Sequence, residues 1–355
     1  TGIQVQPYQV VQGTNGASVC NNNNFAVWKN GIYYNYAENP ASAWTINGNT
    51  VTAVAPPSTP TGPVLWEGIR AETMRVGNRG TISNNNVNGT GATADAMNWW
   101  GVWGLNYRGG SSLSTQVYFT GNTVSNVELG LVHSAAADIV VTGNTLSASN
   151  QAISIQREYS SAGVIQPTGG INNIDATGGN TINGVATAGA TLAQLFTIED
   201  AVNHKIDDCI FGLARIKTNE LFVTANSGSI QCGIDAATAG NILNVDDGTY
   251  AENIIVNKSL TILGPNSAIN PCSGSRVAEA IVVPAIAAIA SGEIFHVAAS
   301  NVTISGFTID GDNTALMSGY TSTNGADIDA AEGITVYETG INGLTASNNI
   351  IQNLS

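Results

Sequence analysis

Apolar residues and threonines alternate in short stretches along most of the chain, and each stretch leads into a Gly-Asn or Asn-Asn pair. Residues 140–146, Val-Val-Thr-Gly-Asn-Thr-Leu, show this pattern, with a second apolar run starting just after the pair. Alternation with a period of two predicts β-strands, and a Gly or Asn pair supplies the left-handed backbone of a tight bend. Copies of the motif lie at residues 45–51, 81–87, 118–124, 176–182, 303–309 and 345–351.

The spacing of these copies indicates a unit of about 21 residues that repeats with inserts of different lengths. Bends at positions 48, 84, 121, 143 and 179 lie 36, 37, 22 and 36 residues apart. A second marker, Gly or Ala followed by Ile or Leu, opens another short strand at positions 31, 68, 104, 130, 152 and 333. Strands repeated in this order predict an all-β fold, a parallel β-helix solenoid. Unrelated hairpin turns are the alternative.

Asparagine recurs at the second position of the bend and predicts a ladder inside the solenoid. If successive repeats stack at about 4.8 Å, each side-chain amide can hydrogen bond to the next. Phe307 interrupts the series in the last third of the chain. The predicted ladder consists of Asn49, Asn85, Asn122, Asn144 and Asn180.

The repeat pattern stops near residue 184, where helical signals begin. A capping box at Thr191–Gln194 starts a helix whose apolar face extends to Ile206. Residues 229–237 form a second, short helix that would cover the open strand edges of the repeats after it. Strands are expected between the two helices, at residues 209–216 and 221–224.

We therefore predict two parallel β-helices in tandem, joined by a short helical junction that also provides a cap. Residues 1–187 hold repeats of the first β-helix, 188–228 the junction, and 229–355 the capped start of the second. A single continuous β-helix with an insert is the alternative. The chain opens and closes within repeat-like sequence, so we expect a segment of a longer polypeptide whose export signal lies elsewhere.

Composition excludes two classes of partner. The net charge is -14 with only 11 basic residues, whereas nucleic-acid phosphates need Lys and Arg. No apolar run reaches the roughly 18 residues of a membrane-spanning helix.

The second set of repeats carries a group of motifs at residues 229–231, 234–237, 244–250, 252–254 and 258–264, and a further one at 301–311. The first five resemble the opening of right-handed parallel β-helix (pectin-lyase-like) domains, and 301–311 is similar to a later repeat of the same family. Such domains occur in pectin methylesterase-like proteins and in large secreted surface proteins of bacteria. The resemblance implies an extracellular location at the cell surface, and enzymes with this fold often act on polysaccharides.

The catalytic constellations of these enzymes cannot be matched residue by residue. Arg215-Ile216-Lys217 is shared with the polygalacturonases, but their Asn-Thr-Asp and Gly-His-Gly motifs are absent, and three residues recur by chance. The three histidines, His133, His204 and His296, lack the spacing of a triad or a metal site.

An aromatic group between the second and third bends is a candidate carbohydrate-binding surface. It consists of Trp99, Trp100, Trp103 and Tyr107, whose exposed ring faces could stack on sugars. Alternatively, Trp100 or Trp103 fills the interior of a wide repeat.

Two further groups carry possible chemistry. Asp310 and Asp312 could share a face and bind calcium through oxygen ligands, or belong to a solvated turn. Apart from calcium, no cofactor is expected. The four cysteines allow disulfides in an oxidising compartment or buried free thiols, and Cys209 is expected near Cys232. The other two are Cys20 and Cys272.

These features together predict a non-catalytic structural or adhesive segment of a long extracellular bacterial surface protein. Its expected partners are surface polysaccharide or neighbouring copies of itself. One alternative is a polysaccharide-active enzyme, whether lyase, esterase or hydrolase, which acid groups clustered with an arginine would favour. The other is a carbohydrate-binding module, which exposed, coplanar aromatic rings would favour.

Overall fold

The computed structural model describes residues 2–5, 18–36, 44–54, 65–73, 79–89, 102–109, 116–135, 138–156 and 173–355. Over these residues the chain is all-β with three helices, and its named strands pair in parallel except β16 with β17. It divides into two compact units. The first comprises residues 1–205 and 210–217, and the second residues 206–209 and 218–355.

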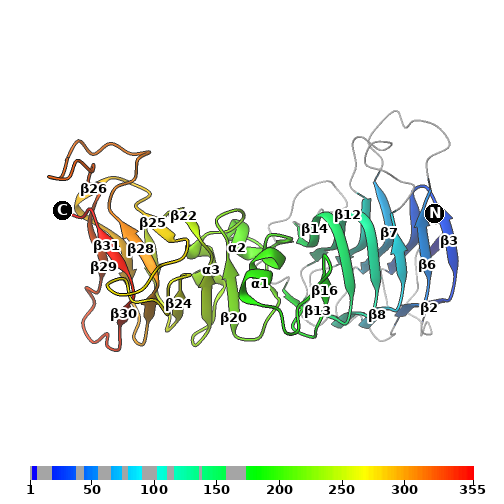
Figure 1. Ribbon diagram of the computed structural model, residues 1–355. Coiled ribbons are helices and arrows are strands. Elements are labelled where there is room, and N and C mark those ends of the chain that lie inside the picture. The colour runs from blue at the N-terminus through cyan, green and yellow to red at the C-terminus, as the bar shows by residue number, and fades with distance from the viewer. Residues whose placement is uncertain are drawn as a thin grey trace. The chain divides into compact units, whose positions relative to one another are not determined.

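The first unit contains two sheets (Figure 1). One consists of β1 (Ile3–Val5), β3 (Asn24–Val27), β4 (Asn30–Tyr36), β6 (Thr50–Ala53), β7 (Trp66–Thr73), β9 (Asn86–Asn88), β10 (Val102–Gly109), β12 (Thr123–Ala135), β14 (Thr145–Ile155), β16 (Thr181–Ile182), β17 (Val185–Ala186) and β18 (Val202–Asn203). The other consists of β2 (Ser18–Asn21), β5 (Trp44–Asn47), β8 (Arg79–Ser83), β11 (Gln116–Thr120), β13 (Ile139–Thr142), β15 (Ile174–Asp175) and β19 (Ala214–Arg215). The chain passes from one sheet to the other in a constant order, so strands one repeat apart lie side by side.

The Gly-Ile marker and the bend of the next repeat pack against each other. Ile32 pairs in register with Ile69, and Ile69 with Leu105, and all three are buried. A Cβ atom added to Gly68 would lie 2.3 Å from Cγ1 of Val87, the valine that follows the Asn-Asn bend. The valine therefore occupies the space that a side chain at the marker would fill, which explains why both markers recur together.

The five predicted ladder asparagines are buried and lie one above another. Asn122 shows the pattern: its Oδ1 accepts from N and Nδ2 of Asn85 at 3.1 and 2.9 Å. Its Nδ2 donates to Oδ1 of Asn144 at 2.9 Å and to the carbonyl of Ile82 at 2.8 Å. The same bonds link Asn49 to Asn85 and Asn144 to Asn180. Each residue before a ladder asparagine has the left-handed backbone of the bend, as in Gly121 with φ 64°.

Replacing Asn122 by alanine tests the ladder. The variant leaves the buried Ile82 carbonyl without its side-chain donor and Asn85 without its acceptor, so we expect a loss of about 3 to 5 kcal/mol of unfolding free energy. Urea denaturation followed by circular dichroism measures it. Thr123→Ala, at the exposed neighbouring position, is the control and should change stability by less than about 0.5 kcal/mol. Equal values for both variants would contradict a stabilising ladder.

The second unit contains three parallel sheets (Figure 1). The first consists of β20 (Glu220–Val223), β21 (Ile242–Val245), β24 (Thr261–Leu263), β27 (Thr303–Ser305) and β30 (Thr345–Ser347). The second consists of β22 (Gly248–Ala251), β25 (Ala280–Val283), β28 (Phe307–Asp310) and β31 (Ile350–Gln352), and the third of β23 (Ile254–Val256), β26 (Ala288–Val297) and β29 (Ala330–Thr335). From β21 onward the chain visits these sheets in turn, and Leu243, Ile262 and Ile304 stack in register in the core.

Phe307, which interrupts the asparagine series, is buried at a bend that keeps the left-handed Gly306. Its amide donates to Oδ1 of Asn349 at 3.0 Å, and Nδ2 of Asn349 donates to the carbonyl of Ile304. The bend therefore persists while an aromatic ring replaces the side-chain amide.

The predicted helix after residue 191 is shorter than expected. Thr191 and Gln194 form the capping box of α1 (Leu192–Glu199), but Val202 lies in β18 and Ile206 in α2 (Lys205–Asp208). Val202 pairs with Ile153 of β14. The chain therefore leaves the helical conformation before Val202 and adds a strand to the open edge of that sheet. The strand expected at 209–216 is likewise reduced to the two residues of β19.

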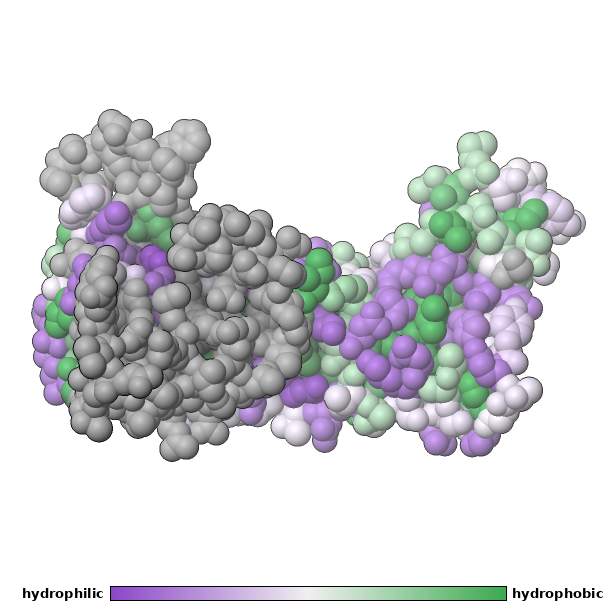
Figure 2. All heavy atoms as spheres, turned by 180° about the vertical axis from the view of Figure 1, so that it is seen from behind, coloured by the Kyte–Doolittle hydropathy of each residue, from purple (hydrophilic) through white to green (hydrophobic). Residues whose placement is uncertain are grey.

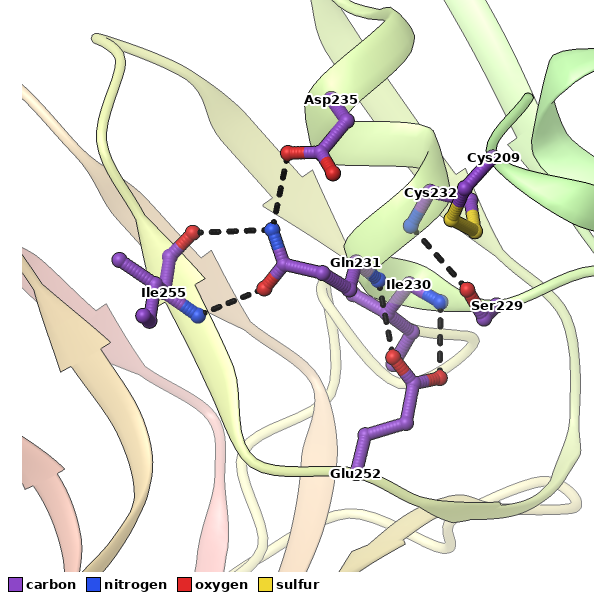
Figure 3. Close-up of a disulfide and its surroundings, with 8 residues drawn as sticks. All are labelled: Cys209, Ser229, Ile230, Gln231, Cys232, Asp235, Glu252 and Ile255. Atoms are coloured by element: carbon purple, nitrogen blue, oxygen red, sulfur yellow. Dashed lines mark hydrogen bonds between the residues drawn. A yellow bond between two sulfur atoms is a disulfide. The ribbon is translucent and has the colours of Figure 1, made fainter. Parts of the chain in front are cut away.

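Helix α3 (Ile230–Ala236) covers the edge of β23, as Figure 3 shows. Oε1 of Gln231 accepts from the amide of Ile255 at 2.8 Å, and Nε2 of Gln231 donates to its carbonyl at 3.4 Å. The side-chain amide thus takes the place of a neighbouring strand. Glu252 accepts from the amides of Ile230 and Gln231 at one end of the helix, and Nζ of Lys258 donates to three carbonyls at the other. Both charges complement the helix dipole.

A disulfide joins Cys209 to Cys232 in α3, with the Cα atoms 4.9 Å apart (Figure 3). The expected proximity of these cysteines is therefore present. Cys20 is a buried free thiol, and Cys272 an exposed one.

Cys232→Ser should lower the unfolding free energy by about 2 to 4 kcal/mol, because the crosslink restricts the unfolded chain. Thermal unfolding with and without reductant measures this. Cys272→Ser is the matched control, since it removes a sulfur atom outside the disulfide. A variant C232S as stable as C272S would show that the crosslink adds nothing.

Candidate functional site

The predicted aromatic surface is described only in part. Trp99 and Trp100 lie outside the described residues. Trp103 is a half-buried residue of β10 that pairs in register with Glu67 of β7. Tyr107 lies further along β10, in register with Ala71. Exposed, coplanar rings in this group remain a prediction, as does the alternative that Trp100 or Trp103 fills the interior of a wide repeat.

The two predicted calcium ligands lie at the end of β28 and just beyond it. Oδ1 of Asp310 accepts from the amide of Asp312 at 3.1 Å and from Nδ2 of Asn353 at 2.7 Å, and Oδ2 accepts from Gln352. Desolvation, followed by the charge of Asp310, raises the pKa of Asp312. Among the described residues, no three His, Cys, Asp or Glu side chains are grouped to hold a metal ion. Calcium binding remains a prediction.

A charged cluster on β4 and β7 is the candidate site in the first unit. Its members, Asn30, Tyr33, Glu67, Arg70 and Glu72, are named the Arg70 cluster below. Parallel pairing sets Asn30 beside Glu67 and Tyr33 beside Arg70. The strand register thus brings together residues that are up to 39 positions apart in sequence.

Arg70 connects the two carboxylates of this cluster. Its Nη1 lies 3.2 Å from Oε2 of Glu67, its Nε donates to Oε1 of Glu72 at 2.8 Å, and its Nη2 also contacts Glu72. The guanidinium carbon lies 5.0 Å from the ring centroid of Tyr33, within range of a cation–π interaction. Oε2 of Glu67 also accepts from Nδ2 of Asn30 at 2.8 Å, and the second carboxylate oxygen of Glu72, Oε2, accepts from the hydroxyl of Tyr33 at 2.7 Å.

The charged side chains of the Arg70 cluster are shielded from solvent to different degrees. The Glu67 side chain is 1% exposed, whereas Arg70 is 24% and Glu72 18% exposed. Desolvation acts to lower the pKa of Arg70, but the charges of Glu67 and Glu72 outweigh it, so this pKa lies above its ordinary value. A general acid must hold its proton, whereas an arginine partner favours the ionised carboxylate. Arg70 and Glu72 are partly exposed, so their polar atoms can be reached by solvent.

The sequence analysis predicts neither the Arg70 cluster nor a buried histidine–glutamate pair in the first unit. Nε2 of His204 lies 2.7 Å from Oε1 of Glu199, while Nδ1 of His204 accepts from the amide of Ala214 at 3.0 Å. These bonds fix the ring so that Nε2 carries the proton. Both side chains are buried, so the pair joins α1 to β19 inside the unit.

Charge is distributed unevenly between the units. The second unit holds 15 of the 25 acidic residues and 2 of the 11 basic ones, so its net charge is -13. The first unit holds the other 10 acidic and 9 basic residues, so its net charge is -1. Its two basic residues are bound to groups of their own chain: Lys258 to carbonyls of α3, and Arg276 to Glu279 through Nε at 2.5 Å. Figure 2 shows one face of the second unit covered largely by hydrophilic residues.

No protein-family model and no curated protein matches the sequence. Among the described residues, no helix has both the length and the hydropathy needed to cross a membrane. The parallel sheets of the described residues are compatible with a β-helix or another solenoid-like fold.

Arg70→Met tests the Arg70 cluster. The substitution removes the cation beside the buried Glu67, and we expect a loss of about 3 to 5 kcal/mol of stability at pH 7. An unpaired buried carboxylate binds a proton more tightly when folded, so part of the loss should be recovered as the pH falls. Urea denaturation between pH 4.5 and 8 measures both effects. Lys29→Met, an exposed site with the same charge change, should have little effect at any pH.

Proposed function

We propose that both units are parallel β-helices and that the chain is a structural or adhesive segment of a long extracellular bacterial surface protein. The constant order in which the chain visits its sheets, with strands of successive repeats in register, carries this proposal. A right-handed coil, as in pectin-lyase-like domains, fits that order. The proposed tandem arrangement is supported by the repeats of similar spacing that the sequence carries on both sides of the helical junction.

The physical basis of a structural role is the way in which such a stack resists deformation. Every repeat is held to the next by backbone hydrogen bonds and by stacked side chains, so each contacts its immediate neighbours. Buried amides such as Asn122 add bonds along the same direction. The side faces then present residues at regular intervals, a surface suited to repeated contacts with a polymer or with other copies of the chain.

The Cys209–Cys232 disulfide supports the extracellular location. Disulfides form and persist in oxidising compartments, and they are rare where thiols are kept reduced. Its place within the α3 cap favours a lasting structural bond over a catalytic one.

Charge favours one class of polysaccharide over another. A net charge of -13 on the second unit repels polyanions, so acidic glycans such as pectin and alginate are poor partners for it. Neutral or cationic glycans remain compatible with this unit.

A carbohydrate-binding module or polysaccharide-active enzyme is the second candidate, and the Arg70 cluster favours it. Tyr33, Arg70 and Glu72 provide an aromatic ring, a donor and an acceptor on adjacent strands, and Trp103 follows one strand further. Sugar-binding sites combine aromatic faces with such polar groups. Engagement of both carboxylates by Arg70 favours binding over cleavage.

A glycan-array screen run beside lyase, esterase and hydrolase assays on pectin, alginate and neutral glycans separates these functions. We expect binding without turnover, and binding by the first unit should weaken at least about tenfold in Glu72→Gln, which loses a charge-assisted acceptor. Glu128→Gln, on β12 of the same unit, is the control. Turnover of any substrate would overturn the structural proposal. If neither binding nor turnover is detected, the chain is a structural spacer without a carbohydrate ligand.

A further inference from the structure

The third sheet of the second unit carries a histidine held between two carboxylates. His296 lies on β26, in register with Ile255 of β23 and Thr335 of β29. Nδ1 of His296 lies 2.9 Å from Oε1 of Glu293 on the same strand. Nε2 lies 2.6 Å from Oε1 of Glu338, in the segment that follows β29. The imidazole thus bridges a strand and the segment beyond its neighbour.

These two bonds determine the charge of the ring. An ionised carboxylate can only accept hydrogen bonds, and a neutral imidazole has a single N–H group. Both ring nitrogens of His296 can donate only if both carry protons. The geometry therefore requires an imidazolium, whose charge lies between those of Glu293 and Glu338.

We propose that His296 is a pH-sensitive clasp that fixes residues 336–341 against β26. When the ring loses a proton, one of its two hydrogen bonds is lost, and Glu293 and Glu338 no longer share a counter-charge. Asn342 remains held on its own, since its carbonyl accepts from the amide of Asn301 at 2.9 Å and its amide donates to Ser300. Opening is therefore confined to the stretch between the end of β29 and Asn342.

The other titratable groups near His296 are Glu332, Tyr337 and Asp235. Glu332 of β29 accepts from the hydroxyl of Tyr337, which raises the pKa of Tyr337 to about 12. The Tyr337 ring lies edge-on to the imidazole, with ring centroids 5.7 Å apart. From β23 the ring faces uncharged Ile255, and Asp235 of α3 lies beyond, bonded to Gln231. The charged neighbours are thus acidic, and the two that contact the ring, Glu338 and Glu293, favour its protonated form.

The direction of the pKa shifts sets the pH range in which the clasp is closed. The bonds to Glu338 and Glu293 raise the pKa of His296 above its ordinary value of 6.5, and the bond to His296 lowers the pKa of Glu338 below 4.5. Because the pKa of His296 is raised, its stabilisation of the closed form is present at low pH and is lost as the pH rises through the raised value. Because the pKa of Glu338 is lowered, its stabilisation of the closed form is lost as the pH falls through the lowered value. The clasp is closed between the two values and opens on either side.

Nuclear magnetic resonance of the histidine rings in the full chain tests the charge directly, because the protein has only three histidines. We expect both ring nitrogens of His296 to be protonated at pH 6, with a titration midpoint above 6.5. Glu338→Gln should lower this midpoint, whereas Glu332→Gln, which removes a carboxylate bonded to Tyr337, should lower it less. A titration midpoint of His296 at or below 6.5 would overturn the proposal.

Hydrogen exchange tests the movement. After correction for the intrinsic effect of pH, amides of residues 336–341 should exchange several-fold faster above the His296 midpoint than at pH 6. Residues 345–347 of β30 are the internal reference and should not change. Glu338→Gln shifts the pH of this transition with the ring midpoint, and its exposed site leaves the fold intact. Corrected exchange rates of residues 336–341 that stay constant from pH 6 to 9 would contradict the proposal.

Discussion

In-register pairing of parallel strands is the constraint on which the rest of this protein depends. Because a strand lies beside its counterpart from the next repeat, each residue stacks on one of similar character, as Ile32, Ile69 and Leu105 do. A slip of one position would turn apolar side chains outward and place polar ones in the core. The buried asparagines reinforce the register, since Asn122 meets Asn85 and Asn144 only when the bends align. Glycine at position 68 is required by the same alignment, which brings the side chain of Val87 against it.

The sequence was informative where a structure depends on neighbouring residues and less so where it depends on distant ones. Bend motifs and the Thr191 capping box are local, and both are present. Val202 shows the opposite case: its helical spacing is overridden by the open edge of β14, which no local pattern reveals. The Arg70 cluster was missed because its members come from different repeats. Aligning the markers Gly31 and Gly68 would have placed Tyr33 beside Arg70, so the signal was present in the register.

The Arg70 and His296 clusters put charges on parallel strands for different ends. Glu67 is almost fully buried, and it is balanced by an arginine that stays protonated at all ordinary pH values. His296 is 21% exposed and is held by partners that solvent reaches. Solvent screening makes its bonds weak as a source of stability. A weak, titratable contact is nevertheless what a segment needs if it is to open without unfolding the sheet beneath it.

Charge also differs between the two units. The first unit is nearly neutral, and its Arg70 is held between two carboxylates. In the second unit, Lys258 and Arg276 are committed to helix carbonyls and to Glu279. An acidic polymer that contacts this unit would therefore meet uncompensated carboxylates. The excess negative charge of the second unit therefore opposes the close approach of polyanions, acidic glycans included.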